Sequence, residues 1–188
     1  MARVEKFTAA DLALMPEDGQ RYELIGGDLH VSRQPSWAHQ YVCGQLNRFL
    51  QEWSARTGTG MANAAPGLLF ADDDDVAPDV VWISWARLAG ALDAAGHLRA
   101  APELVVEVLS PGAANEQRDR QAKLELYSRR GVMEYWVVNW MQRVVEVHRR
   151  EQGALRLAAT LYEQDALTSP MLPGFTCSIS KLFFAPPQ

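Results

Sequence analysis

The sequence has little cysteine and no long apolar run. Its 188 residues include only Cys43 and Cys177, and neither belongs to a CxxC spacing. A disulfide framework and a cysteine zinc site are therefore excluded. Residues 1–6 lack the apolar core of a signal peptide, and no run approaches the roughly 18 apolar residues of a membrane span. These absences predict a cytoplasmic protein with no membrane contact.

The chain also lacks the excess of positive charge that non-specific binding to nucleic acid requires. Its formal net charge is -5. Non-specific binding to nucleic acid instead comes from many contacts of Lys and Arg with phosphate. Segment 116–150 is an exception, because it holds eight Lys or Arg against five Asp or Glu. A local basic patch on an acidic chain is therefore expected.

Length and composition predict one globular domain over residues 1–188. The chain is 48% hydrophobic and 22% charged, which is typical of a folded protein rather than a disordered one. Strand-like and helical segments are interleaved along the sequence. This order predicts the α/β or α+β class, built around one mixed β-sheet.

The first part of the chain carries clear local signals. Thr8 and Asp11 have the spacing of a capping box, which predicts a short helix over 9–15. Gly26 and Gly27 suit the positive φ angles of a primed turn, so an N-terminal hairpin is expected. Ser36 is a good N-cap for the helix that should follow. The expected bounds are 21–25 and 28–33 for the hairpin strands and about 56 for the end of the helix.

The remaining elements are expected from hydrophobic pattern and turn residues. Asn115 can cap a helix that should end near Gly131. The four aspartates at 72–75 are expected to form a solvated loop. Strands are expected at 67–71, 78–83, 103–109, 155–161 and 175–179, a second hairpin at 134–150, and a short helix at 85–91.

Glu107 is the most informative residue, because it interrupts a strand made almost wholly of Val and Leu. Five of the seven residues from Glu103 to Leu109 are Val or Leu, as in a strand buried on both faces. A buried ionised carboxylate costs on the order of several kcal/mol unless a cation or hydrogen-bond donors compensate it. A partner for Glu107 is therefore expected elsewhere in the chain.

Two other charged residues could supply that compensation. Asp79 stands at the start of a hydrophobic strand, and Lys123 lies on the helix that follows the Glu107 strand. Two carboxylates on neighbouring strands can bind one Mg²⁺, which prefers oxygen ligands. A lysine beside the ion can orient or deprotonate the attacking water, and the combination suits phosphodiester hydrolysis.

Each of these residues also has a structural interpretation. Asp79 follows a proline and could be a turn residue, and Glu107 could belong to a buried ion pair. Asp119 and Lys123 have the i,i+4 spacing of a solvated helical pair. His39 could be a helix-end or core histidine, and Glu23 could pair with a basic residue across the sheet. From the residues alone, a metal-dependent hydrolase is only somewhat favoured over structural roles.

The order of the motifs resembles the Uma-type family of restriction endonucleases, a branch of the PD-(D/E)XK nuclease superfamily. The matching segments cover nearly the whole chain, and their order makes the match more specific than any one of them. They are 21–29 (RYELIGGDL), 35–39 (PSWAH), 77–81 (APDVV), 102–111 (PELVVEVLSP), 119–127 (DRQAKLELY), 131–138 (GVMEYWVV) and 172–174 (LPG).

This resemblance implies a restriction-endonuclease-like core, a mixed sheet flanked by helices. It implies Asp79 and Glu107 as metal ligands, with the backbone carbonyl of Val108 as a third. The superfamily pattern places a lysine two residues after the second acid, where this chain has Leu109. The resemblance implies that Lys123, on the following helix, replaces this lysine. It also implies that Glu23 and His39 lie around the same cleft.

The sequence therefore predicts a magnesium-dependent endonuclease that hydrolyses phosphodiester bonds in DNA, with manganese as an alternative ion. The first rival is a catalytically silent nuclease fold that binds nucleic acid or protein, and a second is a hydrolase of small phosphodiesters. The basic segment, with Arg118, Arg120, Arg129 and Arg130, could contact the DNA backbone. Six tryptophans predict either an exposed apolar face and a homodimer or simply a well-filled core.

Overall fold

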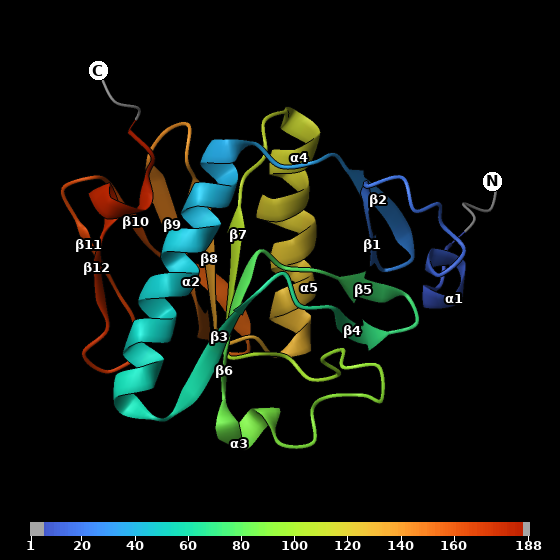
Figure 1. Cartoon of the computed structure of the whole chain (residues 1–188), viewed down its shortest axis with the longest axis horizontal. Coiled ribbons are helices and arrows are strands. Elements are labelled where there is room, and N and C mark those ends of the chain that lie inside the picture. The colour runs from blue at the N-terminus through green and yellow to red at the C-terminus, as the bar shows by residue number, and fades with distance from the viewer. Residues whose placement is uncertain (1–5, 186–188) are drawn as a thin grey trace.

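The computed structural model describes residues 6–185, and its centre is a six-stranded mixed sheet (Figure 1). The strands of this sheet are β3 (Gly60–Ala64), β6 (Val80–Ser84), β7 (Leu104–Val108), β8 (Glu134–Asn139), β9 (Val144–Glu151) and β10 (Ala154–Leu161). Their order is β10-β9-β8-β7-β6-β3. Strands β7 and β8 are parallel and the other pairs are antiparallel. The mixed sheet that the sequence predicts is confirmed.

A second, four-stranded sheet lies beside the first and contains the N-terminal hairpin (Figure 1). Its strands are β1 (Arg21–Ile25), β2 (Asp28–Ser32), β4 (Leu68–Ala71) and β5 (Asp74–Val76), in the order β2-β1-β5-β4. Gly26 and Gly27 make the expected turn with φ angles of 57° and 76°. Near the C-terminus, β11 (Ala166–Thr168) pairs with β12 (Thr176–Ser178).

Helices cover both faces of the six-stranded sheet. The helices are α1 (Ala9–Leu12), α2 (Trp37–Thr57), α3 (Trp85–Leu88), α4 (Ala113–Gln117) and α5 (Lys123–Arg130), with a π-helical segment at Arg118–Ala122 and a 3₁₀ turn at Ile179–Leu182. Helix α2 packs on the face that carries Val106, and α5 packs on the face that carries Val105. Glu107 therefore points toward α5, because side chains alternate along a strand.

Several predicted boundaries are wrong. The first helix ends at Leu12 rather than residue 15, and β3 and β5 were not expected. The helix expected to begin at Asn115 begins at Ala113, and the Asn115 amide donates to the Pro111 carbonyl instead of capping. The acidic tip is not a solvated loop throughout, since Asp74 is buried in β5. Within residues 6–185, no helix combines the length and the apolar character that crossing a membrane demands.

Candidate active site

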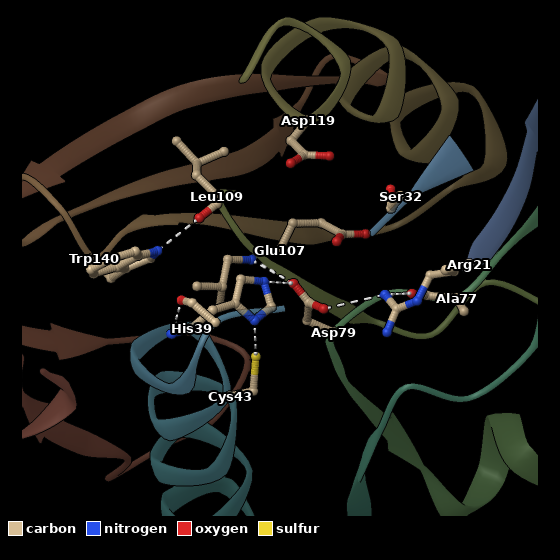
Figure 2. A network of polar contacts seen from close by, with 12 residues as sticks. Arg21, Ser32, His39, Cys43, Ala77, Asp79, Glu107, Leu109, Asp119 and Trp140 are labelled. Atoms are coloured by element: carbon tan, nitrogen blue, oxygen red, sulfur yellow. Dashed lines mark hydrogen bonds and ion pairs between the residues drawn. The ribbon is translucent and has the colours of Figure 1, made fainter. Parts of the chain in front are cut away.

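The five candidate side chains all line one cleft, which has a volume of about 180 Å³. The cleft lies where the first hairpin, the start of α2 and the helical region after β7 approach the ends of β6 and β7. Glu23 comes from β1, His39 from α2, Asp79 from the residue before β6, Glu107 from β7 and Lys123 from α5. Figure 2 shows His39, Asp79 and Glu107 turned toward the same space. Segments far apart in the sequence therefore build one polar site.

Sheet register places Asp79 beside Glu107. Val80 pairs with Val106 on the neighbouring antiparallel strand, so the next position along brings Asp79 level with Glu107. The backbone N–H of Val108 donates to Asp79 Oδ2 over 2.8 Å. Arg21 reaches the other carboxylate oxygen, with its Nη1 atom 3.4 Å from Asp79 Oδ1. The two acids thus meet across adjacent strands.

Glu107 is 2% exposed and has two donors on its Oε1 atom. Lys123 Nζ lies 2.9 Å away and the Tyr127 hydroxyl 2.7 Å away. Burial raises the pKa of Glu107 to about 8. The positive charge of Lys123 acts to lower this pKa, whereas the nearby acids Asp79 and Asp119 raise it further. The site therefore disfavours one more negative charge unless a further cation is present.

Lys123 is the central cation of the site and is 1% exposed. Its Nζ atom lies 3.0 Å from Glu23 Oε1 as well as 2.9 Å from Glu107 Oε1, and 4.0 Å from Asp119 Oδ1. Burial works to lower the pKa of Lys123, but these three carboxylates together raise it. The ammonium is therefore held charged, and it links the N-terminal hairpin to β7.

His39 connects Asp79 to a buried thiol. Its Nε2 atom lies 3.3 Å from Asp79 Oδ2, and its Nδ1 atom lies 3.5 Å from Cys43 Sγ one helical turn later (Figure 2). Burial acts to lower the pKa of His39, but the hydrogen bond to Asp79 raises it overall. Burial and the nearby acids Asp79 and Glu107 raise the pKa of the Cys43 thiol far above its ordinary value. Cys43 is therefore a protonated contact of the imidazole rather than a nucleophile.

Sequence reasoning did not place three charged residues in the cleft, and the interpretation of Asp119 and Lys123 as a solvated pair is wrong because both side chains are buried. Arg118 lies between Asp119, at 2.9 Å, and the Ser32 hydroxyl, at 2.6 Å, and so ties the π-helical segment to β2. Arg21 bonds Asp79 and the Ala77 carbonyl. The i,i+4 spacing of Asp119 and Lys123 was the available signal for Asp119, because it puts both on one helical face. The pairing of Arg118 with Ser32 had no local signal.

The oxygens that face the cleft fit a hard divalent cation. Asp79 Oδ1 is held only by the long contact to Arg21, and Glu107 Oε2 makes no hydrogen bond to residues 6–185. Val108 also lines the cleft, and its backbone carbonyl is the third oxygen that the resemblance implies as a ligand. Two carboxylates and one carbonyl are donors that Mg²⁺ prefers. Asp79, Glu107 and Val108 could therefore hold such an ion.

A second group of potential ligands suits magnesium less well. One atom each from His39, Cys43 and Asp79 lie within 4.8 Å of one another. A metal at this place would need the thiolate of Cys43, which its raised pKa opposes. A sulfur donor also selects softer metals than magnesium. This group is better described as a hydrogen-bonded chain that orients His39.

The mixed sheet flanked by helices is the restriction-endonuclease-like core that the resemblance implies, and it brings two acids and a lysine together at one cleft. The chain belongs to the Uma2 family, whose model, described as "Putative restriction endonuclease", matches residues 8–180. The family assignment and the fold together support a nuclease.

Among solved structures, the chain is similar to a "putative nuclease belonging to DUF820" from Anabaena variabilis ATCC 29413. The TM-score is 0.75 at 19% identity, over 94% of this chain and 97% of that one, so the likeness concerns the fold. A type IIG restriction endonuclease, BpuSI, gives a TM-score of 0.41 at 14% identity, over 77% of this chain and 15% of that one. No curated protein matches the sequence.

Proposed function

We propose that the protein is a magnesium-dependent endonuclease that hydrolyses phosphodiester bonds in DNA. One observation carries the proposal: Asp79 and Glu107 meet across adjacent strands, and the Lys123 ammonium lies 2.9 Å from Glu107 in the same cleft. Asp79, Glu107 and the Val108 carbonyl would hold the ion, and manganese could replace magnesium there. The bound ion would supply a Lewis acid that offsets charge on the phosphoryl oxygens.

The other side chains of the cleft would position the water and the substrate. Lys123 donates hydrogen bonds and would orient the attacking water while offsetting developing negative charge. Glu23 fixes the Lys123 ammonium, since it lies 3.0 Å from Nζ and is itself held by the Ala77 N–H. His39, whose pKa is raised by the hydrogen bond to Asp79 against the effect of burial, would carry a proton near a phosphate oxygen. These five residues form the proposed catalytic set.

Cleavage of plasmid and oligonucleotide DNA with Mg²⁺ or Mn²⁺ tests the proposal. We expect a chelator and the Glu107→Gln substitution each to lower the rate at least about 100-fold, because both remove metal binding at the cleft. Glu151→Gln, at an exposed glutamate in the last position of β9, is the matched control and should cleave normally. Cleavage that survives Glu107→Gln would remove the assignment.

The silent nuclease fold remains the alternative, and one observation favours it. Leu109 occupies the position of the superfamily lysine, and it is fully buried. A parent protein that binds Mn²⁺ through Asp79 and Glu107 but cleaves no DNA would support this alternative. A parent protein that turns over small phosphodiesters but shows no salt-sensitive binding to DNA would instead indicate a small substrate.

We also propose a homodimer and a cytoplasmic location. Trp37 and Phe184 are exposed aromatic side chains whose rings contact each other edge to face. Such an exposed apolar pair supports association with a second copy of the chain. The buried free cysteines Cys43 and Cys177 are compatible with a reducing compartment.

A further inference from the structure

A second hollow of about 340 Å³ adjoins the candidate catalytic cleft. The two spaces share Ser32, Arg33, Gln34, Pro35 and Ser110 among their lining residues. One wall of the second hollow is the connection between β2 and α2, and the other is the connection between β7 and α4. Anything held there would therefore lie directly beside a group bound in the catalytic cleft.

The two hollows differ in the acids that line them. The catalytic cleft is lined by four acids and four Lys or Arg residues, namely Glu23, Asp79, Glu107, Asp119, Arg21, Arg33, Arg118 and Lys123. The second hollow has no acidic residue among its lining residues within 6–185 and contains a single charged side chain, that of Arg33. An anion in the second hollow would therefore lie near a guanidinium and no carboxylate, whereas in the catalytic cleft it would lie near four carboxylates as well as the basic side chains.

Arg33 differs from the other arginines of the cleft. Arg21 is paired with Asp79 and Arg118 with Asp119, so both guanidinium groups already have a counterion. Arg33 is exposed, and the ion pairs that arginines form within the described part of the chain do not include it. Its five N–H donors are free to bind phosphate oxygens in a bidentate manner.

We propose that the second hollow binds the phosphodiester group next to the one that is cleaved, and that Arg33 is its principal contact. The inference rests on the proposed nuclease function and extends it by fixing the direction in which the substrate strand leaves the cleft. Gln34 and Ser110 line both spaces and add polar groups between the two phosphates. Arg33 positions the strand and takes no part in the bond that breaks.

Binding and cleavage by Arg33→Gln test this subsite, with Arg156→Gln as matched control. Arg156 is an exposed arginine on the edge strand β10, away from both hollows. For Arg33→Gln we expect the KM for an oligonucleotide to rise about tenfold with little change in kcat, as for one lost charge-assisted contact. In chelator, so that the DNA stays intact, the slope of log Kd against log salt should fall by about 1.

A small substrate with a single phosphodiester separates the subsite from the catalytic cleft. Bis(p-nitrophenyl) phosphate has no neighbouring phosphate, so Arg33→Gln should lower its kcat/KM much less than that of the oligonucleotide. An equal loss on both substrates, or a salt slope matching that of Arg156→Gln, would overturn the assignment. A parent that binds DNA without cleaving it would refute the nuclease function, while the salt slope would still decide the role of Arg33. A parent that does not bind DNA at low salt would refute both.

Discussion

At the scale of single residues, Lys123 determines the charge balance of the cleft. Its ammonium is the shared partner of Glu23 and Glu107 and lies 4.0 Å from Asp119. All four side chains are buried. Removing one partner of a buried ion pair leaves charges without compensation, which is more costly than never having buried them. Lys123 is therefore a structural residue as well as a proposed catalytic one.

Replacing Lys123 with methionine should lower the free energy of unfolding by about 3–5 kcal/mol, because the buried acids Glu23, Glu107 and Asp119 lose their cationic partner. Urea denaturation of the metal-free protein measures this. Lys181→Met, at an exposed lysine, is the control and should change stability by less than about 0.5 kcal/mol. If the two variants are equally stable, the buried network does not hold the site together.

Glu107 predicts how the stability of the metal-free protein depends on pH. Burial raises its pKa to about 8, from an ordinary value of 4.5. A carboxyl whose pKa is raised on folding stabilises the protein fully below 4.5, and this contribution is lost as the pH rises through 8. In chelator, the Tm of the parent should therefore fall relative to that of Glu107→Gln between about pH 5 and pH 8, by a few degrees.

Thermal unfolding of both proteins at several pH values checks this. Other titrating groups are common to both, so the difference in Tm isolates residue 107. A difference in Tm that stays constant across this range would mean that Glu107 is already ionised at pH 5, paired with Lys123.

At the scale of elements, Asp74 joins the N-terminal sheet to the end of α5. Its carboxylate accepts hydrogen bonds from the Gly26 N–H at 2.7 Å and from the side chains of Arg129 and Arg130, each at 2.6 Å. The sheet carries Glu23, and α5 begins with Lys123. The spacing between these two site residues therefore depends on Asp74, which forms no hydrogen bond or ion pair with either of them.

Asp74→Asn should lower the free energy of unfolding by about 1–3 kcal/mol at pH 7, since charge-assisted hydrogen bonds are lost. Burial works to raise the pKa of Asp74, but the Gly26 N–H and the two arginines lower it below its ordinary value of 3.8. Its stabilisation is therefore present above about 3.8 and is lost as the pH falls further.

Urea denaturation between pH 7 and pH 3 should show a gap between the parent and Asp74→Asn that closes only in acid. Asp73→Asn, at the exposed neighbouring turn residue, should follow the parent throughout. A gap of the same size for Asp73→Asn would show that charge at the tip, not the contact with α5, is responsible.

The local sequence pattern was sufficient to predict some elements of the fold and not others. The Glu107 strand, the Gly26–Gly27 turn and the shared helical face of Asp119 and Lys123 follow from spacing alone. Strand β3 is made mostly of small residues, and it forms because it pairs with β6. Which of four adjacent aspartates is buried is decided by Arg129 and Arg130, more than 50 positions away along the chain. Such long-range pairings leave no periodicity to detect.

At the scale of the whole molecule, the tryptophans divide between core and surface. Trp53, Trp82 and Trp136 are buried, so filling the core explains these three. Trp37 is 76% exposed, and Phe184 beside it is 37% exposed. Phe184 and Met141 line a hollow of about 300 Å³ between α2 and the C-terminal segment, and the Trp37 ring contacts Phe184 beside it. Exposed apolar groups concentrated at one place are typical of a surface that binds a partner.

The proposed homodimer predicts a different effect for each of the two exposed tryptophans. If this apolar hollow is the contact between copies, Trp37→Ser should raise the dimer dissociation constant about 10- to 100-fold, as expected when a central interface tryptophan is lost. Trp85 is also exposed, at 50%, but lies at α3, so Trp85→Ser should leave the dimer intact. Analytical ultracentrifugation over a range of concentrations distinguishes these outcomes. If the unsubstituted protein is monomeric at every concentration, the proposed dimer is refuted. If only Trp85→Ser dissociates the dimer, the contact between copies lies near Trp85, at the other end of α2.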